Sequence, residues 1–134
     1  MAHWKTVGLL SIALCGALWI APGAVNAADG YTLESMKLNS ASDLVDVCTV
    51  EPTNDQYEAA LAFCYGFFEG AIRYHQAITG SDTHKELVCA PSGTTRLQAV
   101  DVFVAYMQGN PQYANEEAID AIFRALMARW PCDK

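Results

Sequence analysis

The residues in this 134-residue chain that are best able to do chemistry are its cysteines. Cys15 lies in an apolar N-terminal stretch, which leaves Cys48, Cys64, Cys89 and Cys132, spaced 16, 25 and 43 residues apart. Structural zinc sites usually use close C-x(2–4)-C pairs, and no CxxC redox motif is present. An even number of cysteines in a short exported domain instead predicts two disulfides, with three possible connectivities.

The other reactive side chains form no recognisable catalytic or metal-binding motif. His75 and His84 lie nine residues apart with no HExxH pattern; His75 falls on an apolar helix face and His84 in a polar stretch. No serine lies in a G-x-S-x-G elbow, and cysteines consumed in bridges offer no nucleophilic thiolate. Glu116, Glu117 and Asp120 could suggest a metal cluster, but a solvated helix start explains them better. We therefore expect no enzyme, no metal and no cofactor.

The N-terminus has the layout of a secretory signal. Lys5 precedes an apolar run over residues 7–25, and no acidic residue appears before Asp29. Val25 and Ala27 supply small residues at the −3 and −1 positions of a cleavage site. We expect residues 1–27 to be a cleaved signal peptide, residues 28–134 to be a single domain, and the mature protein to be periplasmic. The alternative is an uncleaved anchor.

Charge and length exclude several classes of protein. The chain has 8 basic and 15 acidic residues, a formal net charge of −7, and 52% hydrophobic residues. Cleavage would remove Lys5 and no acidic residue, leaving 107 residues with a charge of −8. Such an acidic protein lacks the cations that neutralise nucleic-acid phosphates, and it is too short for a multidomain enzyme. No later apolar run of about 20 residues could span a membrane.

Apolar residues recur with helical spacing throughout the rest of the chain, and no β-hairpin pattern competes with them. Ser40 with Asp43 is a weak capping start for a first helix, and Asn54 or Asp55 can cap a second that runs to about residue 78. Thr95 with Gln98 forms a capping box for a third helix. Asn115 can cap a fourth, which ends before Pro131. The sequence predicts an all-α, disulfide-stapled bundle of four main helices.

The second of these helices is apolar over most of its circumference, which predicts a central position. Gly66 and Gly70, one turn apart, would let another backbone approach closely, although they also lower helix stability. A short turn should make the third and fourth helices antiparallel, bringing Cys89 towards Cys132. Cys48 would then pair with Cys64; this pairing is preferred, and the other connectivities stay open.

An ordered set of short motifs resembles the Tai/Rap family of type VI secretion amidase immunity proteins. The resemblance covers about residues 40–132. It rests on residues 44–48, Cys64-Tyr65-Gly66-Phe67 with Gly70, Cys89-Ala90-Pro91, Thr94 and Thr95 with Gln98, Asn110-Pro111, Ala125-Leu126 and Trp130-Pro131-Cys132. It implies a periplasmic helical protein, often a homodimer, that binds a peptidoglycan amidase injected by a neighbouring cell and occludes its active site. An acidic inhibitor would also attract a basic toxin.

Two exposed loops are the predicted contact surface for this partner. The first holds Ser81, Asp82, His84 and Lys85, and the second holds Gln112 and Tyr113. The alternative for each loop is an ordinary connector. Two other functions stay open: an acid-responsive periplasmic chaperone, which fifteen carboxylates would make pH-sensitive, and a generic exported helical interaction protein.

Overall fold

The computed structural model describes residues 30–81 and 83–132, so the predicted signal peptide and Asp82 lie outside it. These residues form the helices η2 (Ser35–Lys37), α1 (Ala41–Cys48), α2 (Tyr57–Thr79), α3 (Arg96–Gly109), η3 (Pro111–Tyr113) and α4 (Ala118–Arg129). The described residues form no strand, only an isolated bridge between Val88 and Pro131. None of the described helices has the length and apolarity to cross a membrane. The predicted all-α fold of four main helices is confirmed.

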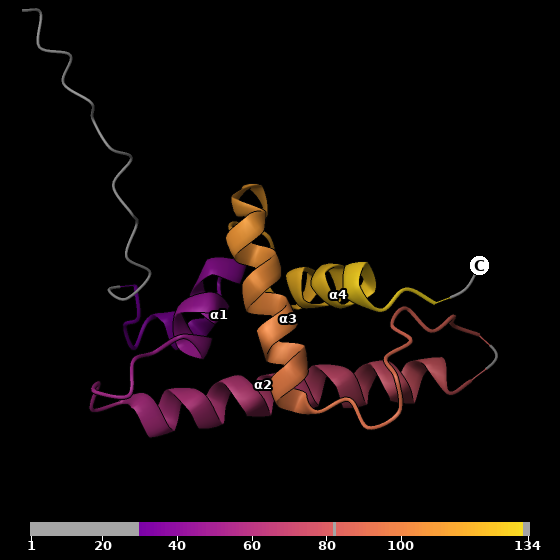
Figure 1. Ribbon diagram of the computed structural model, residues 1–134, viewed down its shortest axis with the longest axis horizontal. Coiled ribbons are helices and arrows are strands. Elements are labelled where there is room, and N and C mark those ends of the chain that lie inside the picture. Colours follow the sequence, from indigo (N-terminus) through magenta and orange to yellow (C-terminus); the bar gives the residue numbers. More distant parts are fainter. Residues whose placement is uncertain (1–29, 82, 133–134) are drawn as a thin grey trace, which may run out of the picture.

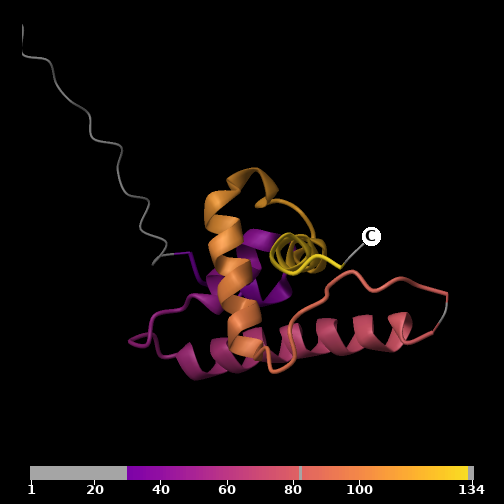
Figure 2. The same ribbon diagram turned by 45° about the vertical axis from the view of Figure 1, so that its right-hand side comes forward.

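The long helix α2 forms the floor of the bundle, with α1 over its N-terminal part and α3 rising from it (Figure 1). Helix α4 packs against α3 but runs crosswise to it, as the rotated view also shows (Figure 2). The predicted antiparallel packing of these two helices is therefore wrong. Residues 110–117 separate them and include η3, so the connection redirects the chain instead of folding it straight back.

Two helices begin at the capping boxes that the sequence predicts. In α1, Asp43 N–H donates to Ser40 Oγ (3.3 Å) and Ser40 N–H donates to Asp43 Oδ2 (3.1 Å). In α3, Gln98 N–H donates to Thr95 Oγ1 (3.2 Å) and Thr95 N–H donates to Gln98 Oε1 (2.8 Å). Each box satisfies amides that the helix itself cannot pair, a contribution of about 1 kcal/mol.

The other two predicted caps are wrong. Asn54 Oδ1 accepts the Gln56 N–H at 2.8 Å in a turn before α2, and Gln56 then occupies the N-cap position without a side-chain bond. Asn115 does not cap α4, which begins at Ala118. The backbone before α4 is held by α1 instead, because Ala41 N–H donates to the carbonyl oxygen of Glu116 at 2.7 Å.

The hydrophobic core lies above α2 and is centred on Phe68 and Phe103, whose rings meet edge to face at 5.5 Å. Only one stripe of α2 is buried: Ala60, Cys64, Phe68, Ala71 and His75. Outside that stripe, Phe63 and Phe67 are only partly buried, and Tyr74 is 70% exposed. The prediction that α2 is central is therefore wrong. Helix α2 lies at the edge because α1 and α3 pack on one side of it only.

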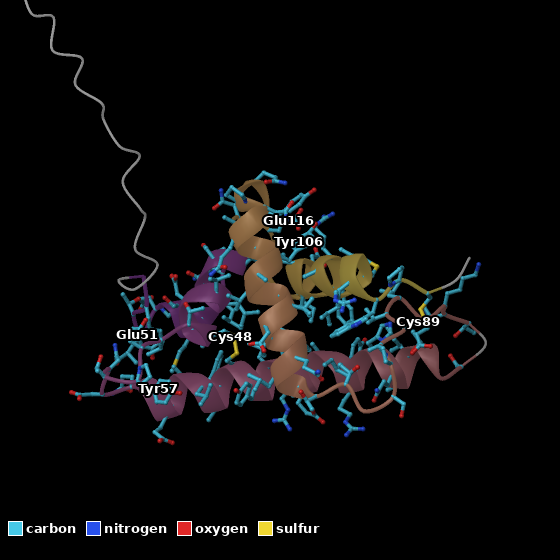
Figure 3. The ribbon with its side chains drawn as sticks, in the orientation of Figure 1. Cys48, Glu51, Tyr57, Cys89, Tyr106 and Glu116 are labelled. Carbon is cyan, nitrogen blue, oxygen red and sulfur yellow. A yellow bond between two sulfur atoms is a disulfide. The ribbon has the colours of Figure 1, made fainter. Side chains whose placement is uncertain are left out.

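Two disulfides join elements that are distant in the sequence. Cys48–Cys64 ties the end of α1 to α2, with a Cα–Cα separation of 5.3 Å. Cys89–Cys132 ties the segment before α3 to the chain end beyond α4, at 4.9 Å. These are the preferred pairs, although the second forms beside a crosswise helix rather than an antiparallel one. Figure 3 shows Cys48 at the core and Cys89 at the far end of the molecule.

Candidate partner-binding surface

The first predicted contact loop connects α2 to α3 and is exposed at its tip. Ser81, His84 and Lys85 are all exposed, while Asp82 lies outside the described residues. Ser81 Oγ donates to the Ile78 carbonyl at 3.1 Å, and Thr83 Oγ1 lies 2.7 Å from Ser81 Oγ and 3.0 Å from His84 Nδ1. These contacts are all local, so they shape the tip without anchoring it to the core.

The second half of this loop is fixed to the rest of the molecule. His75 Nε2 accepts the Leu87 N–H at 3.0 Å, and Cys89 N–H donates to the Trp130 carbonyl at 2.9 Å. The Cys89–Cys132 bond adds a covalent tie two residues beyond Leu87. The exposed tip of the loop is therefore followed by a segment, from Leu87 to Cys89, that is bonded to α2 and to the chain beyond α4.

The second predicted contact loop, residues 110–117, is built around a stack of side chains. Tyr113 stacks on Tyr106 with ring centroids 6.2 Å apart, and the Arg124 guanidinium lies 4.4 Å from the Tyr113 ring centroid. Arg124 binds Glu116 through two bonds, Nε to Oε2 at 2.9 Å and Nη2 to Oε1 at 2.8 Å. This hydrogen bonding raises the pKa of the Arg124 guanidinium. Glu116 and Tyr106 are labelled at this end of the molecule in Figure 3.

The backbone of this second loop is also tied to neighbouring elements. Ser42 N–H donates to the Ala114 carbonyl at 2.9 Å, and Asn110 Nδ2 donates to the Tyr106 carbonyl at 2.8 Å. Within this frame Gln112 is exposed, whereas Tyr113 is half-buried. Gln112 is therefore available for contact, and Tyr113 supports the loop. That either residue touches a partner stays a prediction.

The two predicted contact loops lie apart. The tip of the first follows the C-terminal end of α2, and the second loop follows the C-terminal end of α3 (Figure 1). The structure does not bring their predicted contact residues together into one patch.

The sequence reasoning missed an apolar groove between α2 and the start of α4. It has a volume of about 420 Å³ and is lined by Phe63, Gly66, Phe67, Gly70, Ala71 and Ile119. A Cβ atom added at Gly66 or Gly70 would meet nothing within 4 Å. The prediction that these glycines admit a close neighbour is therefore wrong within this chain. The glycine spacing did signal the groove, but the sequence could not show that the groove is open.

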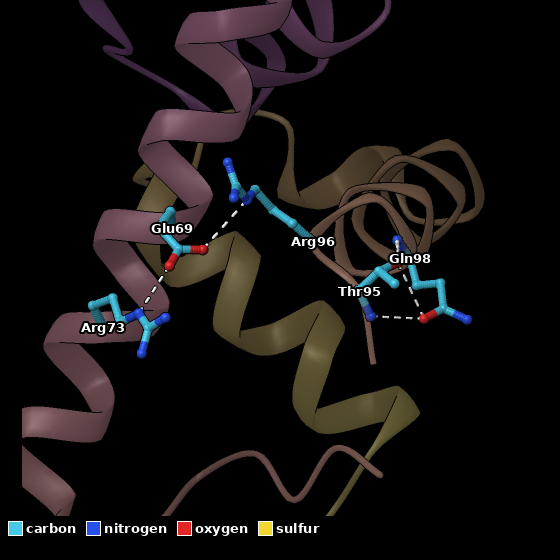
Figure 4. Close-up of polar contacts among 5 residues, drawn as sticks. All are labelled: Glu69, Arg73, Thr95, Arg96 and Gln98. Atoms are coloured by element: carbon cyan, nitrogen blue, oxygen red, sulfur yellow. Dashed lines mark hydrogen bonds and ion pairs between the residues drawn. The ribbon is translucent and has the colours of Figure 1, made fainter. Parts of the chain in front are cut away.

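A second feature missed from the sequence is a charged cluster beside the start of α3. Arg73 Nε donates to Glu69 Oε1 at 2.8 Å, and Arg96 Nε lies 3.3 Å from Glu69 Oε2 (Figure 4). The hydrogen bond from Arg73 holds the pKa of the Glu69 carboxyl below its usual value. The i, i+4 spacing of Glu69 and Arg73 was visible in the sequence, but the approach of Arg96 depends on the fold.

Metal-type ligands come together at one place among the described residues, where Glu86, Cys89 and Cys132 offer atoms within 4.8 Å of one another. The two sulfur atoms are bonded to each other as a disulfide, so neither is a thiolate. Metal binding by cysteine requires the thiolate, and this group is therefore not a metal centre in the oxidised protein.

The model of the family described as Rap1a immunity proteins matches residues 40–132, which is more than half of the chain. The chain belongs to the Rap1a immunity protein family. No curated protein and no solved structure matches the chain. The resemblance drawn from the sequence motifs is thus confirmed at the level of the family.

Membership in the Rap1a family indicates an immunity protein that binds a cognate toxin effector. The matched region spans all four main helices and both disulfides. Several motifs of the resemblance are close to the disulfides in this Rap1a protein. The Cys64 to Phe67 motif lies on α2 opposite Cys48, and the Trp130 to Cys132 motif pairs with Cys89.

Proposed function

We propose that this Rap1a family member binds a peptidoglycan amidase effector of type VI secretion in the periplasm and blocks the amidase active site. Residues 1–27 would direct export and be removed, and residues 28–134 would be the acting protein. The proposal is carried by the family match over residues 40–132. The two disulfides support an oxidising compartment, because such bonds persist outside the cytosol.

The second loop has the rigidity that an occluding element needs. Glu116, Arg124 and Tyr113 hold its side chains in place, and α1 holds its backbone. A loop that is already ordered loses little conformational entropy when it enters an active-site cleft. Gln112 is exposed at its turn and is our first choice for a contact residue there. The exposed tip with Ser81, His84 and Lys85 is the second contact element.

The acidic surface supports attraction to a basic partner. Glu51, Asp55 and Glu58 are all exposed on the segment that leads into α2 and on its first turn. With a formal charge of −7 over the whole chain, the protein would accelerate its encounter with a cationic toxin at low salt. The association rate with the amidase should therefore fall as salt is raised from low to physiological strength.

We further propose a homodimer through the apolar groove on α2. Phe63 and Phe67 line the groove beside the open space over Gly66 and Gly70, so a second copy turned about a two-fold axis could pack apolar side chains into that space. Sedimentation of the purified protein tests this directly. Gly70→Leu fills the gap and should shift the protein to monomer, while Ala128→Leu adds an isopropyl group at an exposed position of α4 and should not. A dimer that persists in Gly70→Leu would exclude this face.

The proposed function is tested with purified type VI amidase effectors. Calorimetry should detect a tight complex with one of them, and cleavage of peptidoglycan peptides should stop at one equivalent of this protein. A complex in which amidase activity persists would overturn the occlusion mechanism. Failure to bind any of these amidases would overturn the assigned class of partner.

A further inference from the structure

A cavity of about 310 Å³ lies between α2, the segment before α3, the start of α3 and the end of α4. Its apolar wall includes Ile72, Phe123 and Trp130. This volume is at the lower end of the range for small-molecule sites, which are mostly apolar and carry a few convergent polar groups. The function proposed above makes no use of this cavity.

One side of the cavity carries excess positive charge. Arg73 and Arg96 both line it and both pair with Glu69, so one carboxylate is shared by two guanidinium groups (Figure 4). The cavity is also lined by Thr95 at the N-terminus of α3, where the helix dipole adds partial positive charge. This side therefore favours a carboxylate.

A negative charge, the carboxylate of Glu86, lies elsewhere in the cavity lining. Glu86 lines the same cavity and forms no ion pair within residues 30–81 and 83–132. Buried His75 also lines the cavity, and its Nε2 accepts the Leu87 N–H at 3.0 Å.

We propose that this cavity binds a short peptide with free termini and an apolar side chain. The carboxylate would bind Arg73 and Arg96, the ammonium would bind Glu86, and the apolar side chain would pack on Phe123 and Trp130. A purely anionic ligand would be repelled by the carboxylates of Glu69 and Glu86. A purely cationic ligand would be repelled by both arginines. Two guanidiniums and two carboxylates around an apolar wall instead match a ligand that carries one charge of each sign.

Titration of the ¹⁵N-labelled protein with leucyl-leucine tests this proposal, with the amide of Leu87 and the indole N–H of Trp130 as reporters. We expect saturable shifts at both positions. The N-acetyl peptide lacks the ammonium, the C-terminal amide lacks the carboxylate, and glycyl-glycine lacks the apolar side chains. Each should bind at least five-fold more weakly than leucyl-leucine.

Charge-neutralising variants then assign the two ends of the ligand. Glu86→Gln should weaken leucyl-leucine at least five-fold and leave the affinity for its N-acetyl form unchanged. Arg96→Gln should weaken leucyl-leucine at least five-fold and leave the affinity for its C-terminal amide unchanged. The exposed residues Glu58 and Lys37 lie outside the cavity, so Glu58→Gln and Lys37→Gln serve as matched controls with unchanged affinity. Absence of saturable shifts, equal binding of the blocked peptides, or unchanged affinity in both cavity variants would overturn the proposal, whatever the outcome with the amidase.

Discussion

The imidazole of His75 accepts a hydrogen bond from the backbone N–H of Leu87 at 3.0 Å, across twelve residues of sequence. The same ring packs 5.1 Å from the ring of Phe123 on α4. One buried side chain on α2 thus contacts both α4 and the segment that carries the first predicted contact loop. This contact fixes the base of the loop whose tip carries Ser81 and His84.

Replacement of His75 by phenylalanine should loosen that segment. The ring would keep its apolar packing, but the Leu87 N–H would lose its acceptor, at a cost of about 1 kcal/mol for a partly buried bond. Hydrogen exchange measured by NMR should show faster exchange of the Leu87 amide. His84→Phe, at an exposed position that does not contact Leu87, is the control. Equal protection of this amide in wild type and His75→Phe would contradict the role of the imidazole.

Phe103→Ala should destabilise the whole fold. Phe103 is fully buried and meets Phe68 edge to face, so truncation leaves a cavity between α2 and α3. Such substitutions cost about 3–5 kcal/mol, a large part of the stability of a small domain. Urea unfolding followed by circular dichroism measures the change. Leu33→Ala removes an apolar side chain that is 65% exposed and should change stability by no more than about 0.5 kcal/mol.

Asp46→Asn should stabilise the protein near neutral pH. Burial raises the pKa of the Asp46 carboxyl, and the nearby Asp43 carboxylate raises it further. A carboxyl whose pKa is higher in the folded state takes up protons on folding, so it opposes folding at pH values above that pKa and ceases to do so as pH falls below the unfolded value. The stability gain from asparagine should therefore be present at pH 7 and disappear by about pH 3.

Urea unfolding of Asp46→Asn and wild type at both pH values measures this difference. Asp101→Asn, at an exposed position on α3, is the matched control for removing one negative charge. A stability difference for Asp46→Asn that is the same at pH 7 and pH 3 would show that ionisation of Asp46 is not its cause.

Arg124→Met should loosen residues 110–117 without unfolding the bundle. Methionine keeps much of the side-chain length but loses both bonds to Glu116 and the charge over the Tyr113 ring. Amide exchange within residues 110–117 should accelerate, and binding of the proposed amidase should weaken, because the loop must then be ordered on binding. Arg129→Met, which contacts neither Glu116 nor Tyr113, is the control. Unchanged exchange in this loop would show that backbone contacts alone order it.

The parts of the fold that were predicted correctly depend on local patterns. The Ser40–Asp43 and Thr95–Gln98 boxes each involve residues three apart, so the sequence shows both partners at once. The start of α4 was missed because a bond from Ala41, distant in sequence, holds the backbone before it. Local propensity carries no information about such a contact.

The two features missed from the sequence are the apolar groove and the charged cluster. Both depend on how the helices pack against one another or against a second copy of the chain. The apolar pattern of α2 shows that Phe63 and Phe67 prefer burial, but the same pattern fits burial within one chain or between two. The charged cluster likewise joins Glu69 on α2 to Arg96 on α3, and only the packing of these helices brings them together. The exposure of Ser81, His84, Lys85 and Gln112 could be read from the sequence because polar connections usually lie at the surface, whereas their contact with a partner stays a prediction.

The two disulfides have a further consequence for how the chain matures. Each links cysteines that are consecutive among the four of the described residues, Cys48 with Cys64 and Cys89 with Cys132, so the two covalent rings neither overlap nor nest. A chain entering an oxidising compartment from its N-terminus would expose the first pair before the second. Oxidation in order of emergence would then join the native pairs directly, so we expect little need for a disulfide isomerase to correct mispaired cysteines.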